Sequence, residues 1–322
     1  MIVRLIHITL FICVVSVGYS QQEETYTQYI FNHYAQNPAY GGTKSCPDIK
    51  FGTRAQWVGF GGGPVTSFFS YNTAIGYKDQ TSKSWHGIGT YIVDDRTGTA
   101  NGAHGFYKST SFYLSYAFHV RLSHRIVASA GLFVGAREFS SGVGSSRDPL
   151  LSPTSRIIAP DIGAGILVYH PDWFLSLAIK QIFTYTVKST SATGATDNLF
   201  QYRARQYYFT YAKWIEADDL LFSYTPSFNI KYQESVLPSV DLSVMFHYMD
   251  NKFNLGASYR IGDGIAALLQ FNLLSKLSVG YAYEYPFNKM NKGTRQTHEI
   301  ILKWDPCWSN NSHFGSVNCP SF

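Results

Sequence analysis

Charged residues are scarce in this 322-residue chain. Asp, Glu, Lys and Arg make up 15% of it, against about 25% in ordinary soluble domains. The net charge of +5 is small and the basic residues are scattered, so the sequence does not favour a nucleic-acid-binding protein. Beyond residue 20 no run of about 18 apolar residues occurs, which excludes a membrane protein built from spanning helices.

Sequence signatures of catalysis and of cofactor binding are missing as well. The glycine-rich run 59-GFGGGP-64 lacks the Lys-Ser/Thr pair of a phosphate loop and leads into a predicted strand instead of a helix. The His residues show no metal-binding spacing, and no Gly-x-Ser-x-Gly element is present. The sequence therefore predicts a protein that is not an enzyme and that binds neither a metal nor an organic cofactor.

The first twenty residues have the features of a secretory signal peptide. Arg4 supplies a basic start, residues 10–17 form an apolar core, and Gly18 and Ser20 are small residues at −3 and −1 before Gln21. The apolar run is shorter than the roughly 20 residues that a spanning helix needs. We therefore expect residues 1–20 to be removed and the mature chain to be exported.

Aromatic residues and glycine are abundant: the chain has 24 Tyr, 23 Phe and 27 Gly. Many segments alternate between two kinds of face. In residues 111–121, Phe112, Tyr116 and Val120 share one face, whereas the other face carries mainly small, polar or basic residues. Such strands suit a wall between lipid and a water-filled lumen.

This alternation defines fourteen candidate strands, most of them near the 9–11 residues that a tilted strand needs to cross a bilayer. They are residues 48–57, 65–77, 85–93, 108–121, 125–138, 160–169, 173–182, 203–215, 220–232, 237–248, 252–261, 265–273, 277–285 and 295–304.

The connections between these strands also alternate. Very short turns follow most even-numbered strands, and longer loops, notably 139–159 and 183–202, tend to follow odd-numbered ones. This asymmetry is typical of outer-membrane barrels and places both termini on the periplasmic side. The sequence predicts an all-β fold, a transmembrane antiparallel β-barrel of about 14 strands over residues 48–304, located in the outer membrane. A soluble two-domain β protein is the alternative.

The mature N-terminus, residues 21–47, has a different character. Residues 27–42, TQYIFNHYAQNPAYGG, carry no charge and are rich in Tyr and amides. We expect them to plug or line the lumen, because amides supply both donors and acceptors to inward polar groups. A periplasmic segment ordered only by a partner is the alternative. The plug and lumen residues are predicted to be Tyr29, Phe31, Asn32, Asn37, Pro38, Tyr40, Gly41, Arg54 and Gln56, with Arg54 bonding carbonyls of the 37–41 turn or a lumen carboxylate.

The alternation also points a set of charges inward. They either brace the barrel and hold the plug, or favour anions in a pore. The set comprises Lys50, Arg54, Arg121, Arg125, Arg137, Lys180, Lys231 and Arg260, with Asp241, Glu284 and Glu299.

Five blocks of sequence carry a family resemblance: 28-QYIFN-32, 37-NPAYGG-42, 54-RAQWVG-59, 63-GPVT-66 and 298-HEIILKW-304. In their order and spacing these blocks resemble the PorP/SprF family of type IX secretion system membrane proteins from Bacteroidetes. The resemblance extends from residue 28 to about 304. Two features depart from the pattern: a His follows the first block where the family has Pro, and the C-terminal tail has no counterpart.

The resemblance implies a non-enzymatic component of the type IX protein secretion and gliding motility machinery. Its implied partners are periplasmic ring or translocon proteins, or the C-terminal sorting domain of a cargo anchored at the cell surface. A passive porin or small-molecule channel is the alternative. We assign partner docking to the first loop, through Trp57, Gly61, Gly63 and Pro64, together with the loops 139–159 and 183–202. Aromatic residues anchor interfaces, and glycine lets a partner approach closely.

Three Cys lie beyond the signal peptide: Cys46, Cys307 and Cys319. Barrel closure places the first and last strands side by side, so Cys46 and Cys307 share one rim in an oxidising periplasm. A bridge from Cys46 to Cys307 or Cys319 and a local Cys307–Cys319 bridge are both open, and one Cys is left over. Residues 305–322 are expected to form a Cys-containing periplasmic tail, which begins where Pro306 ends the last strand.

Overall fold

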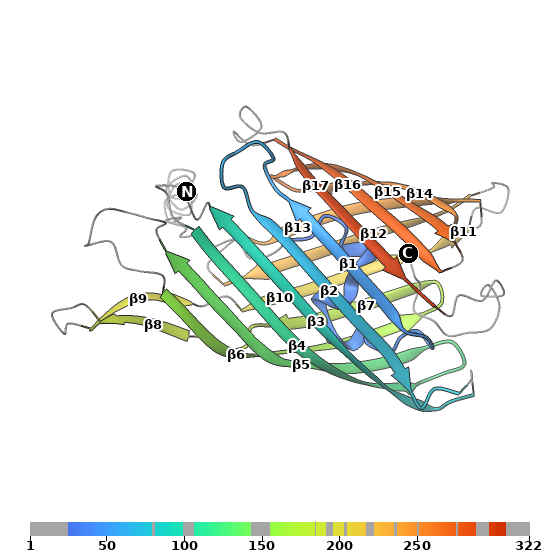
Figure 1. Cartoon of the computed structure of the whole chain (residues 1–322). Helices are drawn as coiled ribbons and strands as arrows, with labels where there is room; N and C mark the ends of the chain where they lie inside the picture. Colours follow the sequence, from blue (N-terminus) through green and yellow to red (C-terminus); the bar gives the residue numbers. More distant parts are fainter. Residues whose placement is uncertain are drawn as a thin grey trace, which may run out of the picture.

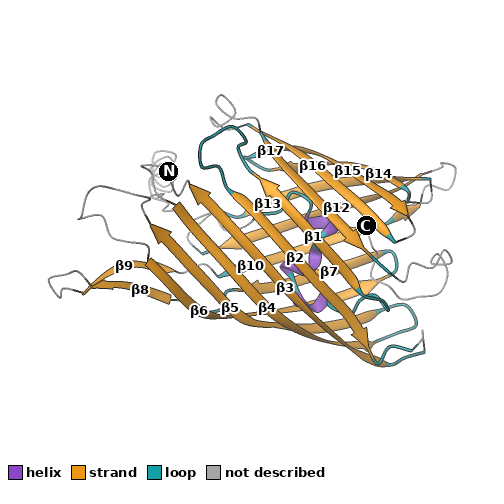
Figure 2. Ribbon diagram, viewed as in Figure 1, coloured by secondary structure: helices purple, strands orange, loops and turns teal. Residues whose placement is uncertain are grey.

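The computed structural model describes residues 25–78, 81–98, 106–142, 155–183, 185–190, 196–202, 205–216, 222–234, 237–249, 251–274, 276–287 and 296–306. Within these residues the chain forms a closed antiparallel β-barrel with short helices inside it (Figures 1 and 2). None of the helices among the described residues is long and apolar enough to cross a membrane.

Fourteen strands form the barrel wall. They are β1 (Asp48–Ala55), β2 (Val65–Ile75), β3 (Ser84–Gly98), β4 (Phe106–Arg121), β5 (Val127–Gly142), β6 (Ser155–His170), β7 (Trp173–Lys180), β10 (Gln206–Lys213), β12 (Phe222–Gln233), β13 (Ser239–Tyr248), β14 (Phe253–Arg260), β15 (Gly264–Leu274), β16 (Leu277–Pro286) and β17 (Thr297–Trp304). A two-residue strand, β11 (Ile215–Glu216), pairs beside β12.

Each wall strand pairs antiparallel with its neighbours in the chain, and the first strand closes the barrel against the last. Ile49 pairs with Trp304 and Ala55 with His298 in the β1–β17 ladder. Closure abolishes the sheet edge at this seam, which is how a β-structure satisfies its backbone groups in lipid. The predicted all-β barrel of fourteen antiparallel strands is confirmed.

The alternation in the sequence follows the two sides of the wall. Along β4, Ser111, Tyr113 and His119 face the lumen and are buried, whereas Phe112 and Leu114 are exposed outward, Leu114 to 58%. Large apolar patches are rare on proteins that face water. The outward apolar side chains of a barrel face lipid instead, so the same pattern that sets the strand register also makes the wall compatible with the membrane.

The wall is uneven in height. β3 has 15 residues and β4, β5 and β6 have 16 each, whereas β1, β7 and β10 have eight. The loop predicted at 139–159 is therefore shorter than expected, because β5 and β6 continue into it. The loop predicted at 183–202 contains a hairpin of β8 (Tyr185–Thr190) and β9 (Thr196–Tyr202), which forms a separate two-stranded sheet.

We name the two ends of the barrel by their connections. The long-loop rim is the end where β1 ends, and the β8–β9 hairpin projects there (Figure 1). The short-turn rim is the end where β1 begins, and it carries the turns at 122–126 and 171–172. Lys44 and Asp305 meet at the short-turn rim, with Nζ and Oδ2 3.8 Å apart. Which rim faces the periplasm remains a prediction.

Candidate functional site: a lumen filled by residues 25–43

The lumen contains the N-terminal part of the described chain, which we call the lumen segment (residues 25–43). Every residue from 26 to 43 is buried. The segment folds into the 3-10 helix η1 (Tyr29–Phe31), one turn of α-helix α2 (His33–Gln36) and the 3-10 helix η2 (Pro38–Tyr40), all inside the ring of strands (Figure 2). Pro38 opens η2, where its missing N–H costs nothing.

The start of the lumen segment is held by a buried cluster of charges. Arg54, near the end of β1, donates from Nη1 to Thr25 O (2.5 Å) and Oγ1 (2.8 Å). Glu299 accepts from the backbone N–H of Thr27 (2.8 Å), and Glu284 accepts from its hydroxyl (2.6 Å). The segment therefore presents its own donors to the carboxylates of the last two strands, next to the closing seam.

The same carboxylates are braced by two guanidinium groups. Arg54 Nη2 lies 3.2 Å from Glu284 Oε2. Arg260 Nε lies 2.6 Å from Asp241 Oδ1, and its Nη1 lies 3.4 Å from Glu284 Oε1. Buried charges are tolerated only when they are paired and hydrogen-bonded. Removing one member would leave the others uncompensated, so this network fixes the lumen wall and the lumen segment together.

Tyr hydroxyls join the middle of the segment to two separate parts of the wall. Tyr29 hydrogen bonds with Ser227 (2.9 Å) and Ser243 (3.1 Å) on β12 and β13. Tyr34 hydrogen bonds with Ser115 on β4, with the two oxygens 2.5 Å apart. The small polar residues on inward positions therefore serve as partners for long Tyr side chains that reach across the lumen.

Asn37 makes the densest set of side-chain bonds in the segment. Its Nδ2 donates to Ser176 Oγ (2.8 Å) and to the backbone carbonyls of Ile166 (3.0 Å) and Leu177 (3.2 Å). Its Oδ1 accepts from Ala39 N (2.8 Å) and so caps η2. A Cβ at Gly165 would lie 2.0 Å from Oδ1 of Asn37, so this contact requires glycine on β6.

Four wall side chains bind the backbone where the segment leaves the lumen. His119 Nε2 donates to Gly41 O (2.8 Å) and Trp85 Nε1 donates to Gly42 O (3.0 Å). Ser129 and Asn72 complete the set, with bonds to Ala39 O (2.9 Å) and from Gly42 N (3.2 Å). The polar backbone of this buried turn is thereby satisfied by the wall.

The remaining predicted plug residues lie in different settings. Phe31 is buried in η1, and Tyr40 stacks on His33 with ring centroids 5.0 Å apart. Asn32 is fully buried, but its side chain has no hydrogen-bond partner among the described residues, unlike the amide pairing that we expected. Gln56 lies just beyond β1, where its N–H donates to Pro64 O (2.8 Å) at the base of the first loop.

Of the two alternatives predicted for Arg54, the structure shows the lumen carboxylate. Arg54 binds Glu284, and it also donates to Thr25 at the start of the segment. The inward charges Lys50, Arg137, Lys180 and Lys231 are buried as expected. Arg125 is instead exposed in the 122–126 turn, because the strand β5 starts only at Val127.

The first loop, residues 56–64, is tied to its neighbours at the long-loop rim. Trp57 has a positive φ of 52°, and its N–H donates to Thr297 Oγ1 (3.4 Å) at the start of β17. Gly61 is exposed and has open space around it, whereas a Cβ on Gly63 would lie 2.4 Å from Gln56 O. Pro64 is half-buried. Partner docking at this loop remains a proposal.

The Cys prediction falls mostly outside the described residues. Cys46 is half-buried on the short-turn rim, between the lumen segment and β1. Cys307 and Cys319 belong to the part of the tail that the structure does not describe, so both pairing alternatives stay predictions. Within the described ranges, no group of three or more His, Cys, Asp or Glu side chains is arranged to hold a metal ion.

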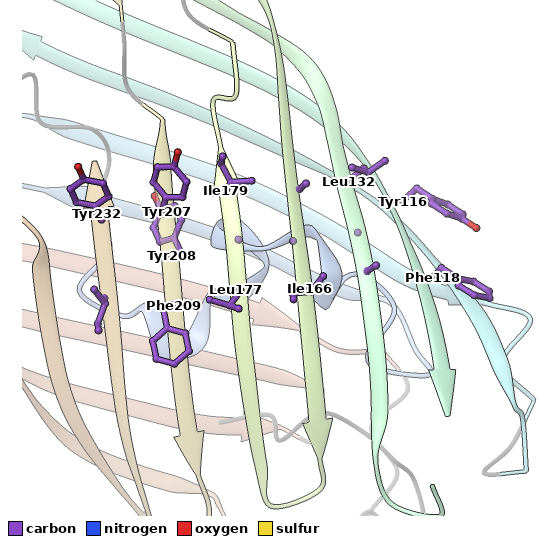
Figure 3. Close-up of a pocket in the computed structure, with 16 residues that line it drawn as sticks. Tyr116, Phe118, Leu132, Ile166, Leu177, Ile179, Tyr207, Tyr208, Phe209 and Tyr232 are labelled. Atoms are coloured by element: carbon purple, nitrogen blue, oxygen red, sulfur yellow. The ribbon is translucent and has the colours of Figure 1, made fainter. Parts of the chain in front are cut away.

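The outer face carries an apolar groove of about 900 Å³ across β4–β7, β10 and β12 (Figure 3). Tyr116, Leu132 and Ile166 line it and are about half exposed. Gly131 and Gly165 also contribute to its lining, and both contact the lumen segment from the inner side. The wall is therefore thin here, and apolar on the lipid side.

The sequence did not identify which wall residues hold the segment. His119, Ser129 and Asn72 occupy inward positions of the period-2 pattern, and that is the only signal the sequence offers. The contacts join residues up to 272 positions apart, as between Thr27 and Glu299, so no local pattern could reveal the pairs.

A closed antiparallel barrel with an apolar outer face and a polar, filled lumen is an outer-membrane β-barrel protein. Its family follows from the sequence: the model of the family "Type IX secretion system membrane protein PorP/SprF" matches residues 18–304. The chain belongs to this family. No curated protein sequence matches the chain significantly.

Solved structures share the barrel fold. The toluene transporter TbuX of Ralstonia pickettii has a TM-score of 0.56 at 11% identity, covering 85% of this chain and 93% of that chain. The Pseudomonas putida toluene transporter TodX has a TM-score of 0.48 at 9% identity, covering 89% and 95%. A Pseudomonas aeruginosa FadL homologue has a TM-score of 0.48 at 10% identity, also covering 89% and 95%. At such identities only the fold is comparable, and of these three structures we base the comparison on TbuX, whose TM-score is above 0.5.

Proposed function

We propose that this protein is a closed docking barrel of the type IX secretion and gliding machinery. It has no catalytic role and binds other proteins at its rims. The long-loop rim faces the cell surface and binds the C-terminal sorting domain of an exported cargo. The short-turn rim faces the periplasm and contacts ring or translocon proteins. Membership of the PorP/SprF family supports a role in the type IX machinery, and the loop asymmetry supports the proposed orientation of the barrel.

The main support for a closed lumen is the position of the lumen segment. Its residues are buried from 26 to 43, and its bonds reach Glu299 on β17, Ser227 on β12, Ser176 on β7 and His119 on β4. A porin keeps its lumen open to water, whereas this segment occupies the space that a solute would cross. We therefore favour docking over the passive-channel alternative.

Co-purification tests the docking role. The full chain, tagged within the exposed turn at Ser123, is extracted from its native outer membrane in mild detergent. We expect a cargo sorting domain, ring proteins or both to co-elute in defined ratio. Elution of the barrel alone or as homotrimers, with neither class of partner, would support the porin alternative and contradict the proposal.

A further inference from the structure

Within the described part of the chain, one edge of the barrel sheet lacks a partner strand toward the long-loop rim. β5 pairs with β6 from Ser155 onward, but β7 pairs with β6 only from Ala164 to His170. Among the described residues a single backbone bond, from Ile182 N to Ile162 O (3.1 Å), extends that contact. β8 and β9 pair with each other instead. The stretch of β6 from Ser155 to Asp161 is therefore an open edge.

Residues between β7 and β10 keep this edge of β6 unpaired. Gln181 follows β7 with a positive φ of 58°, which interrupts the regular β6–β7 ladder. Arg205 Nε donates to Ile182 O (3.0 Å), and Arg205 Nη1 lies 3.4 Å from Glu234 Oε1 beyond β12. The end of β7 is thereby fastened toward the β12 side. The β8–β9 hairpin leaves the barrel wall at this point (Figure 1).

The direction of the free backbone groups follows from the bond at Ile162. Its carbonyl points toward β7, and in an antiparallel ladder residues two apart point their N–H and C=O the same way. Ile158 and Pro160 therefore face the open edge. Pro has no N–H to offer a ladder and is confined to such edges. The edge thus presents the N–H of Ile158 and the carbonyls of Ile158 and Pro160.

The side chains along this edge differ on the two faces. Ile158 is 64% exposed on the outer face. Asp161 is 4% exposed on the lumen face, where its Oδ2 accepts from Tyr113 OH (2.5 Å). Its Oδ1 is buried and has no hydrogen-bond partner among the described residues. A side chain on an added neighbouring strand would lie beside Asp161, because directly opposite residues share a face.

We propose that the open edge of β6, residues 155–161, accepts an extended strand from a partner polypeptide. The strand places an apolar side chain beside Ile158 and a hydrogen-bond donor beside Asp161. Unpaired strand edges are templates for this kind of addition, in which backbone bonds give affinity and alternate side chains give specificity. The inference rests on the proposed docking role, and it names the element of the long-loop rim that an exported domain engages.

Proline at position 158 tests the inference. Because the N–H of Ile158 faces the open edge, Ile158→Pro removes the donor that a partner strand needs and leaves the β5–β6 ladder intact. Ile158→Val is the matched control, since it keeps the N–H and the branched apolar side chain. We expect Ile158→Pro to recover about tenfold less partner than the wild type, the effect of losing one well-formed hydrogen bond. Both variants must run as heat-modifiable folded barrels.

The outcomes separate the inference from the proposed function. Wild-type protein that recovers no partner contradicts the docking role. Wild-type protein that recovers a partner, with Ile158→Pro recovering just as much, leaves the role in place and overturns strand addition at β6.

Photo-crosslinking in intact cells tests strand addition at β6 independently. p-Benzoylphenylalanine is incorporated at position 158, and as a control at position 300, an outward position on β17 that is paired on both sides. We expect position 158 to crosslink to an extended segment of the polypeptide that co-purifies, and position 300 not to. The absence of any polypeptide adduct at 158, or an adduct to a second copy of this chain, overturns the inference.

Discussion

Arg54 and Glu299 face each other in register across the β1–β17 seam, with Nε and Oε2 3.6 Å apart and each side chain 1% exposed. Both also bind the start of the lumen segment, through Thr25 and Thr27. This pair at the closing seam thus also holds the start of the segment. It couples the closure of the wall to the filling of the lumen.

Arg54→Lys tests this coupling. Lysine keeps the charge but loses the planar fork that reaches Thr25, Glu284 and Glu299 together. We expect the free energy of unfolding to fall by about 1–3 kcal/mol, the usual cost of leaving a buried hydrogen-bonding group without its partner. Protease should also cleave residues 25–43 faster in the folded barrel. Limited proteolysis with mass spectrometry measures the cleavage.

The control for Arg54 is Arg96→Lys. Arg96 is 65% exposed and pairs with Asp94 at the surface, so the same change there should leave the cleavage rate unchanged. Equal protection of residues 25–43 in wild type and Arg54→Lys would show that Arg54 does not hold the lumen segment.

Gly87→Ala should displace the lumen segment near its exit. A Cβ at Gly87 would lie 1.8 Å from Gly41 O, a contact that forces the backbone of the segment to move. We expect a folded barrel whose lumen segment is cleaved rapidly. Gly61→Ala is the matched control, because nothing lies within 4 Å of a Cβ there. Unchanged protection in Gly87→Ala would show that the segment does not pass this point.

Asn37 should be the most sensitive amide in the segment. Asn37→Ala leaves two strand carbonyls and Ser176 without their added donor, and we expect a cost of about 1–3 kcal/mol in unfolding free energy. Asn37→Asp should cost more, because a carboxylate cannot donate to the carbonyls of Ile166 and Leu177.

Asn32→Ala is the control for Asn37, because the Asn32 side chain has no hydrogen-bond partner among the described residues. Urea-unfolding midpoints in detergent compare the variants. An Asn32→Ala midpoint as low as that of Asn37→Ala would contradict this ranking.

The sequence predicted the wall well, because strand identity and register are recorded locally. Phe112 and Leu114 point outward and Ser111 and Tyr113 inward, and a shift of one residue would reverse them all. The contacts of the segment are not local. Whether Arg54 reaches Thr25 or the Gly41 turn depends on the path of the chain through the lumen, which no period encodes. The open edge at β6 could not be predicted from the sequence either. How far a strand is paired depends on whether its neighbouring strand continues beside it or leaves the sheet, and no local pattern shows this.

The intact protein should not conduct. With residues 26–43 buried in the lumen, we expect no large, stable, ohmic channels from full-length protein in planar bilayers. Deletion of residues 25–43 should open the lumen and give such channels, provided that the variant still runs as a heat-modifiable barrel. Large channels from the intact protein would contradict the closed lumen and favour the porin alternative.

The orientation of the barrel is testable with tags at its two rims. Gly61, in the first loop at the long-loop rim, is exposed with open space around it, so an epitope inserted there should leave the fold intact. Ser123, in the turn between β4 and β5, is exposed at the short-turn rim and is the matched site. Because outer-membrane barrels place long loops outside and short turns in the periplasm, antibody should label the Gly61 tag on intact cells and the Ser123 tag only after permeabilisation.

The reverse labelling pattern would have consequences beyond orientation. The open edge of β6 lies toward the same rim as Gly61, so a periplasmic Gly61 tag would place that edge among ring proteins instead of surface cargo. The path of the lumen segment provides a second test of the orientation. Thr25 binds Arg54 near the end of β1, and Lys44 pairs with Asp48 at its start, so the segment runs from the long-loop side toward the short-turn rim. With the long-loop rim outside, Thr25, the first described residue, lies toward the cell-surface end of the lumen. This position differs from the periplasmic N-terminus that the loop pattern of the sequence predicts, so we expect a tag fused before Thr25 to share the labelling of the Gly61 tag, and labelling only after permeabilisation would support the periplasmic prediction.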